Sequence, residues 1–338
     1  MSTPDNELLE PFERLLGEIS ATTRLRDIER GGSVEPVWEP LLESGFLDAL
    51  TATEHGGAGL DFAQIGALLQ AAGRRLLPVP FGETLVARAL LAGAGIAPPD
   101  RPIVLVTRSA ENAWQRAVPL AKVAGYALIE TDEQLFLRTL PQSSLRDVGI
   151  AASLAVDVHW PSTAEVASAP SPLPAGAFRS TTAAVHAAHI AGAADQVLKL
   201  TVAHAGQRVQ FGKPIAQAQA IQQQLAVMAE HTVMARMAAQ IGCSGGFPPS
   251  AATAAVAKLV CSSAVPQLTA IAHAVHGAIG ISEEHDLQLF VRRLHEWRLA
   301  DGPESYWALR LGTQYLQGNC SSSIDFAREM RQTGDTTC

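Results

Sequence analysis

The sequence has few charged residues and no excess of positive charge. Charged side chains make up 17% of the 338 residues, below the roughly one quarter that is usual for soluble proteins. Acidic residues outnumber basic ones, 33 to 25, and the net charge of -8 disfavours nucleic-acid binding through clustered Lys and Arg. We therefore expect extensive burial, some of it between subunits, and no nucleic-acid partner.

Cysteine is scarce, and the four cysteines (Cys243, Cys261, Cys320 and Cys338) form no C-x-x-C pair and have no histidine at metal-ligand spacing. We predict reduced thiols, a cytoplasmic protein and no metal site. The N-terminus lacks a basic segment followed by an apolar one, and no long uncharged apolar run follows it. Neither secretion nor association with a membrane is expected.

Three kinds of pattern divide the chain. Apolar residues recur at three- and four-residue spacing at first, which predicts an N-terminal α-helical domain (1–100). Short alternating runs predict a reduced β domain (101–165), followed by a proline-rich connector (166–178). The alanine-rich remainder predicts a C-terminal helical bundle domain (179–338). The expected fold is mainly α with a small central β domain.

Individual elements are marked by residues that start or stop helices. Residues 37–50 are expected to be helical. Asp61 is expected to cap a helix that runs to Leu77, because Pro78 and Pro80 end it. Further helices are predicted at 181–208, 216–241, 250–279, 283–299 and 305–316.

A corner between the first two bundle helices carries the strongest polar pattern. It reads Arg208-Val-Gln-Phe-Gly-Lys-Pro-Ile215, and Gln219 follows it in a glutamine-rich helix. A guanidinium at a helix end, beside a glycine-proline turn and amide side chains, can hold a phosphate group. An ordinary helix-turn-helix with a solvated Arg208 is the alternative.

This corner resembles the Arg-x-Gln-Phe-Gly-x-x-Ile and downstream Gln-x-x-Gln pattern of acyl-CoA dehydrogenases. Two glycine turns, Glu54-His-Gly-Gly-Ala-Gly-Leu60 and Val275-His-Gly-Ala-Ile-Gly280, are similar to turns of the same family. The order of helical domain, β domain and bundle matches too. The chain is most similar to the short subunit of the heterotetrameric (α2β2) steroid-type enzymes, and the fold is expected to be acyl-CoA dehydrogenase-like.

The resemblance implies FAD as cofactor. In the family, the corner and the glycine turn reach across the dimer to the ADP half of a neighbour's FAD. The residues expected to bind it here are Arg208, Gln210, Phe211, Gln219, His276, Gly277 and Gly280.

The sequence departs from the family pattern at several positions that contact FAD in the family. Ala274 stands where the family has an FAD-binding glutamine, and Ala278 replaces a glycine. The family's Thr-Glu-Pro-x-x-Gly-Ser-Asp loop, which contacts the flavin ring, has no counterpart between Arg101 and Pro161. The resemblance therefore implies that this subunit does not hold a flavin ring by itself.

Asp301 takes the place of the family's catalytic glutamate, which removes the α proton of the thioester while a hydride leaves Cβ for the flavin. Aspartate is shorter by one methylene, roughly 1.5 Å of reach. Because Asp followed by Gly-Pro often starts a helix, capping is the interpretation we favour over catalysis. The family's other base position, Ser180 to Ala184 here, offers no carboxylate.

Other histidines carry less weight. His186, His189 and His204 lie on one alanine-rich helix, where a packed or solvated face is expected more often than a metal site.

These features predict a subunit of a heteromeric FAD-dependent acyl-CoA dehydrogenase that introduces an α,β double bond into a bulky acyl-CoA, such as a steroid side-chain thioester. The expected partners are a longer homologous subunit, which supplies the glutamate base, and an electron-transfer flavoprotein or similar acceptor. Two alternatives stay open: a self-sufficient homomeric enzyme that uses Asp301 as base, and a non-catalytic structural subunit.

Overall fold

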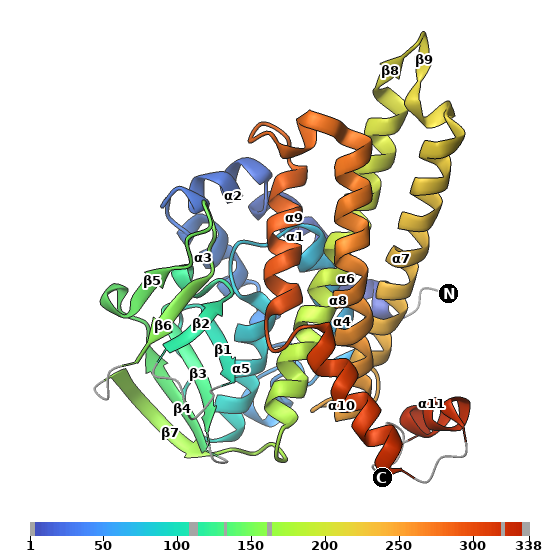
Figure 1. The fold of residues 1–338 in the computed structure, drawn as a ribbon. Coiled ribbons are helices and arrows are strands. Elements are labelled where there is room, and N and C mark those ends of the chain that lie inside the picture. The colour runs from blue at the N-terminus through green and yellow to red at the C-terminus, as the bar shows by residue number, and fades with distance from the viewer. Residues whose placement is uncertain (1–3, 108–113, 132–133, 161–163, 319–321, 333–338) are drawn as a thin grey trace.

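Helices dominate the molecule, and strands are confined to the central part of the chain. The structure, a computed structural model, describes residues 4–107, 114–131, 134–160, 164–318 and 322–332. Figure 1 shows the two main sheets gathered on one side and the longest helices on the other. The predicted fold class, mainly α with a small β region, is confirmed.

The N-terminal part is helical, but its elements are shorter than predicted. Asp61 does cap its helix, since its Oδ1 accepts the Gln64 N–H at 2.8 Å in a capping box. The helix predicted at 37–50 is interrupted at Gly45, whose φ of 77° ends it. The helices are α1 (Pro4–Ile19), α2 (Thr22–Glu29), α3 (Glu35–Glu43), α4 (Phe62–Arg74) and α5 (Phe81–Gly93).

The β region consists of two small sheets, with strand orders β1-β3-β4-β7 and β2-β6-β5. In both, neighbouring strands are antiparallel except β1 and β3. Valines and other apolar side chains from both sheets form a shared buried core. The strands are β1 (Ile103–Thr107), β2 (Trp114–Val118), β3 (Tyr126–Thr131), β4 (Gln134–Thr139), β5 (Leu145–Asp147), β6 (Val156–His159) and β7 (Glu165–Pro170).

Strand β7 corrects the predicted connector. It lies within 166–178 over most of its length and pairs antiparallel with β4 at the sheet edge. An edge strand tolerates proline because one side of its backbone needs no ladder partner, so the proline-rich composition did not exclude a strand. The connecting segment is therefore confined to 171–176.

Helix α6 (Ala177–Gln207) is the centre of the bundle and packs against α4, α7, α8 and α9. Glycines let α4 and α6 approach closely, since an added Cβ at Gly192 would lie 1.9 Å from the Gln70 carbonyl oxygen. This crossing fixes the N-terminal helices against the bundle. The remaining helices are α7 (Gln219–Cys243), α8 (Ala251–His276), α9 (Leu287–Leu299), α10 (Glu304–Gln317) and α11 (Ser323–Gln332).

Helix α8 is buried and very apolar. Within the described part of the chain, Ala251–Ile281 is the one helical segment long and apolar enough to cross a membrane, although no such run was expected. Of its most apolar 18-residue window, 61% is buried against the rest of the protein, which identifies a core helix. Its Lys258 is buried too, and Nζ donates to the carbonyl oxygens of Trp297 (2.7 Å) and Arg298 (2.8 Å) at the end of α9.

Two cysteines belong to this core. Cys243 and Cys261 are buried free thiols, and burial raises the pKa of each to about 12. Cys320 and Cys338 lie outside the described residues.

Helices α6 and α7 are joined by a hairpin of two short strands, β8 (Val209–Gln210) and β9 (Lys213–Pro214). Its turn residues Phe211 and Gly212 have positive φ values of 50° and 79°, as a tight two-residue hairpin turn requires. Figure 1 shows this hairpin projecting beyond the rest of the bundle.

Candidate active site

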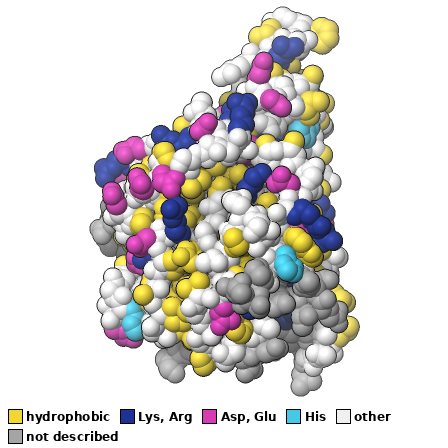
Figure 2. Space-filling view, turned by 90° about the vertical axis from the view of Figure 1, so that its left-hand side faces the viewer, with side chains coloured by type: hydrophobic (Ala, Val, Ile, Leu, Met, Phe, Trp, Pro, Cys, Tyr) yellow, Lys and Arg dark blue, Asp and Glu magenta, His cyan; other side chains and the backbone are white. Residues whose placement is uncertain are grey.

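A pocket of about 590 Å³ lies between the β region and the long helices. Strands β1 and β2 form one wall, while α6, α9 and the loop after α9 form the other. Apolar side chains line much of it, including Leu105, Val118, Val291 and Leu299. Figure 2 looks onto the sheet side, where hydrophobic side chains show in a recess near the middle of the face. A pocket between two layers, with a mainly apolar surface and polar groups at its margins, is a common ligand site.

The loop between α9 and α10 brings Asp301 into this pocket. Asp301 itself has a φ of 56°, and Gly302 follows with a φ of 110°. An added Cβ at Gly302 would lie 2.6 Å from the Tyr306 ring, so glycine is required there. This backbone turns the Asp301 carboxylate toward α6.

Asp301, His186 and Glu83 form a hydrogen-bonded group, which we call the buried triad. His186 Nδ1 lies 2.7 Å from Asp301 Oδ2, and His186 Nε2 lies 3.2 Å from Glu83 Oε1. The side chains of Asp301, His186 and Glu83 are 11%, 5% and 3% exposed. From β1, Thr107 Oγ1 donates to Asp301 Oδ1 at 3.4 Å. The triad thus joins α5, α6 and the α9–α10 loop.

The triad is ionic at neutral pH. Burial by itself lowers the pKa of His186, but its hydrogen bonds to Asp301 and Glu83, together with their negative charges, raise that pKa to about 9. Burial raises the pKa of each carboxyl, yet the hydrogen bond and positive charge of His186 leave the pKa of Asp301 and of Glu83 below the ordinary value. An imidazolium therefore lies between two carboxylates.

This arrangement limits the chemistry of Asp301. It faces the pocket as a carboxylate and can accept a proton, but the imidazolium that stabilises its charge also makes it a weaker base. The capping interpretation of Asp301 is wrong. Helix α10 starts at Glu304 with Pro303 at the N-cap, and no side chain caps it.

Glu83 was not among the predicted site residues, and His186 was expected to lie on a packed or solvated face. One signal was present, because Glu83 is the only charged residue between Arg75 and Arg88. An isolated carboxylate in an apolar segment needs a buried partner. The sequence does not show which residue provides it.

The predicted corner lies on the β8–β9 hairpin and the start of α7. Arg208 is the C-cap of α6, and its guanidinium makes no hydrogen bond or ion pair with any described residue. Phe211 at the tip is 101% exposed. Gln210 and Gln219 are exposed as well. These side chains face outward from the chain that carries them.

The end of α8 lies beside this corner. His204, in the last turn of α6, stacks on His276 with ring centroids 4.3 Å apart. Gly277 ends α8 with a φ of 63°, and an added Cβ at Gly280 would lie 2.9 Å from His276 Cβ. The structure thus brings together the two segments predicted to bind the cofactor, which are the corner at Arg208 and the turn at Gly277–Gly280. Both precede α9 in the chain, whereas Asp301 follows the C-terminal end of that helix.

A strip of apolar side chains on α7 is exposed to solvent. Val227, Val233, Met234 and Met237 are 40%, 46%, 54% and 52% exposed. Their spacing places them on one side of the helix. This α7 strip is typical of a surface that another protein covers.

The exposed corner fits the nucleotide half of a cofactor. The guanidinium of Arg208 has no hydrogen-bond or ion-pair partner among the described residues, and the ring of Phe211 is exposed to solvent. The turn at Gly277–Gly280 lets a phosphate approach the backbone closely. The pocket at Asp301 lies beyond the other end of α9. These residues therefore suit a molecule that extends toward this chain from a neighbour.

The chain is similar in sequence to known proteins. The family profile described as acyl-CoA dehydrogenase, C-terminal domain, matches residues 180–314. Acyl-CoA dehydrogenase IpdE2 of Mycobacterium tuberculosis is 31% identical over 282 residues, which cover 78% of this chain and 81% of that protein.

Solved structures share the fold over nearly the whole chain. The Tcur3481-Tcur3483 steroid ACAD variant has a TM-score of 0.79 at 21% identity, covering 93% of this chain and 98% of its own. The ChsE4-ChsE5 complex of Mycobacterium tuberculosis has a TM-score of 0.72 at 18% identity, covering 95% and 99%. Butyryl-CoA dehydrogenase of Megasphaera elsdenii has a TM-score of 0.70 at 17% identity, covering 94% and 99%.

Proposed function

The chain belongs to the acyl-CoA dehydrogenase family, and from this we propose that it is one subunit of a heteromeric enzyme, in which it completes a partner's FAD site. Family members are FAD-dependent flavoproteins that oxidise the CH–CH bond next to the thioester of an acyl-CoA. The chain is therefore an oxidoreductase of this class. When bound, FAD takes up the hydride that leaves the substrate's Cβ.

The observation that carries the proposal is the exposure of the corner. Phe211 is 101% exposed, and the guanidinium of Arg208 has no partner among the described residues. A large apolar ring beside a free cation has no structural role in the isolated chain. In the assembly, Arg208 would hold the diphosphate, and Phe211 and Gln219 would line the nucleotide. Gly277 and Gly280 would let the backbone approach the pyrophosphate.

The buried triad supports a base supplied by the partner. The α proton of a thioester requires a well-placed base, and Asp301 is held by His186 in a form of lowered basicity. In this chain, Asp301 would instead keep the triad in place and set the polarity of the pocket. A glutamate of a longer homologous subunit would remove the proton.

The α7 strip supports assembly with a homologous subunit. Its four exposed Val and Met side chains lie on the helix that follows the hairpin. A partner that receives Arg208 would also be positioned to cover this strip. We propose an α2β2 assembly, with an electron-transfer flavoprotein or similar protein as electron acceptor.

The substrate is proposed to be a bulky acyl-CoA, such as a steroid side-chain thioester. The Tcur3481-Tcur3483 neighbour is described as a steroid ACAD, and the pocket of about 590 Å³ has a largely apolar lining. A wide apolar pocket suits a bulky hydrocarbon better than a short acyl chain.

A self-sufficient homomeric enzyme is the second candidate. The observation in its favour is that Asp301 lines the pocket as an ionised carboxylate. In that case the base would come from this chain, despite its hydrogen bond to His186.

One experiment separates the two. The chain is purified alone and after co-expression with the homologous subunit encoded beside it, and flavin per chain and acyl-CoA oxidation are measured. We expect flavin and activity only in the mixed complex, at one FAD per pair of subunits. One FAD per chain and turnover by the lone protein would contradict the proposal.

A further inference from the structure

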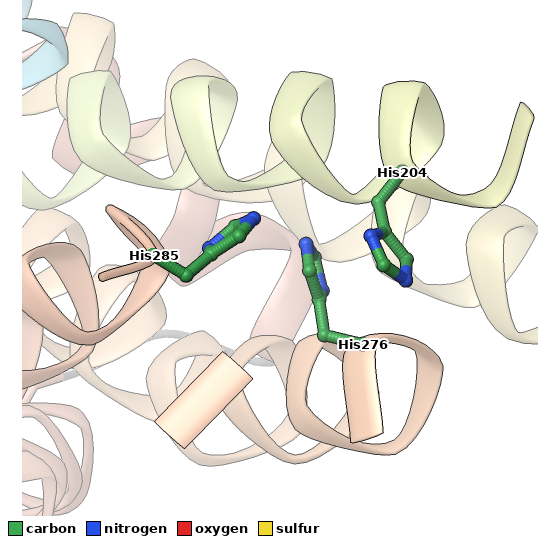
Figure 3. Close-up of side chains that lie close together, drawn as sticks. All are labelled: His204, His276 and His285. Atoms are coloured by element: carbon green, nitrogen blue, oxygen red, sulfur yellow. The ribbon is translucent and has the colours of Figure 1, made fainter. Parts of the chain in front are cut away.

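Three histidines from separate parts of the chain converge beside the corner. His204 comes from α6, His276 from the last turn of α8, and His285 from the segment before α9. One ring nitrogen from each lies within 4.8 Å of the others. Figure 3 shows the three rings turned toward one another in the space between α6 and the α8–α9 connection.

His276 is already arranged as a metal ligand. Its Nδ1 lies 2.8 Å from the Ala272 carbonyl oxygen, to which it donates its proton. The lone pair therefore resides on Nε2, which is buried and has no hydrogen-bond partner among the described residues. The residue is 6% exposed. Metal-binding histidines commonly donate their second ring nitrogen to a backbone carbonyl in this way, which fixes the tautomer.

The other two histidines can move toward His276. His204 and His285 are partly exposed. His285 Nδ1 accepts the Leu287 N–H at 3.1 Å and would release it to bind a metal through Nε2. Leu287 is the first residue of α9, where an N–H has no partner within the helix, and the residue is buried, so the released N–H would lose its hydrogen bond without reaching water. The bond between the metal and His285 must therefore exceed this cost.

Burial and the surrounding charges disfavour positive charge at the three-histidine cluster. Burial first, and then the neighbouring histidines, lower the pKa of His276 to about 4. Burial, His285 and Arg208 lower the pKa of His204. Arg208 opposes any cation, so the ligands must supply enough binding energy to exceed that repulsion.

We propose that His204, His276 and His285 bind one Zn²⁺ or a similar transition-metal ion, with water in the fourth position. Imidazole nitrogen suits Zn²⁺, Ni²⁺ and Cu²⁺, and disfavours Mg²⁺ and Ca²⁺. A tetrahedral site with Zn–N bonds of about 2.0–2.1 Å needs ligand nitrogens roughly 3.3 Å apart. Rotation of His204 and His285 closes this gap. The ion would link the end of α6 to the Gly277–Gly280 turn.

The test uses the chelator-treated full-length chain and Zn²⁺ alone, titrated in a calorimeter. Co²⁺ serves as a second probe, because its visible absorption reports tetrahedral nitrogen coordination. We expect one Zn²⁺ per chain. His204→Ala and His285→Ala should each weaken binding at least tenfold, and exposed His55→Ala should leave it unchanged.

Circular dichroism checks that the variants fold, and His204→Gln and His285→Gln replace any that do not. Absence of a saturable site in the wild-type chain would overturn the proposal. Binding that survives both cluster substitutions, or that falls equally in His55→Ala, would overturn it as well.

Discussion

His186 Nδ1 and Asp301 Oδ2 lie 2.7 Å apart, although the two residues are 115 positions apart in the sequence. This contact fixes the loop after α9 against the central helix of the bundle. It also places a buried imidazolium behind a carboxylate that faces the pocket. The stability of the fold and the basicity of Asp301 therefore depend on the same pair.

Replacing His186 should destabilise the chain severely. His186→Gln removes the positive charge between Asp301 and Glu83 and leaves two buried carboxylates without the cation that contacts both. Breaking a buried ionic group in this way costs about 3–5 kcal/mol. Chemical denaturation measures the loss, and exposed His55→Gln is the control. A change below about 1 kcal/mol, the range of surface pairs, would show that the triad is not ionic.

The triad should also make stability depend on pH. The folded pKa of His186, about 9, lies above the ordinary 6.5, so its contribution is complete below pH 6.5 and is lost as the pH rises through 9. The loss is on the order of 3 kcal/mol. At the acid end, stability falls as Asp301 and Glu83 become protonated, because their folded pKa values are lowered. Unfolding free energies measured across this range test both trends, and a flat profile from pH 6.5 to 9 in the wild type would contradict the first.

Asp301→Asn should have a small effect on catalysis by the mixed complex. If a partner supplies the base, we expect kcat/KM to fall less than about tenfold, whereas loss of a true general base costs about 10²–10⁴. Steady-state oxidation of an acyl-CoA measures the difference. A fall of the larger size, with assembly and flavin content intact, would assign the base to this chain.

Arg208→Ala and Phe211→Ala should lower the flavin content of the mixed complex. Both side chains are exposed in the single chain, so the unfolding free energy of the chain alone should change by less than about 0.5 kcal/mol. Flavin absorbance per complex is the measurement. Arg75→Ala, an exposed arginine on another part of the surface, is the matched control. Unchanged flavin in both corner variants would remove the corner from the cofactor site.

Met237→Glu should prevent assembly with the partner. Its side chain lies in the α7 strip and is 52% exposed, so a charge there is harmless in the single chain but costly in a covered interface. Size-exclusion chromatography of co-expressed subunits gives the readout. Val166→Glu, a similarly exposed apolar position on β7, should leave assembly intact. Equal assembly by both variants would place the interface elsewhere.

Local signals in the sequence predicted much of the fold. Asp61 caps α4 as expected, and the glycine-proline turn predicted within the Arg208–Ile215 corner is part of a hairpin. Strand β7 was missed because it runs directly into a proline-rich segment that is typical of a connector, and only the pairing with β4 reveals it. Such pairing is a property of the tertiary structure, which local composition does not contain.

The candidate site was predictable only in part. Asp301 was found through the family resemblance, but Glu83 and His186 lie 103 positions apart and come together only when α5 packs near α6. The capping interpretation failed for a related reason. A motif indicates what an aspartate can do locally, whereas the nearby cation that determines its role comes from another helix.

The α7 strip has a consequence for the fate of the chain in the cell. Four exposed Val and Met side chains are a surface of the kind that chaperones and proteases recognise in proteins without their partners. If assembly covers the strip, molecules made in excess of the partner would be degraded. The amount of this subunit in the cell would then follow the amount of its partner, independently of how strongly its own gene is expressed.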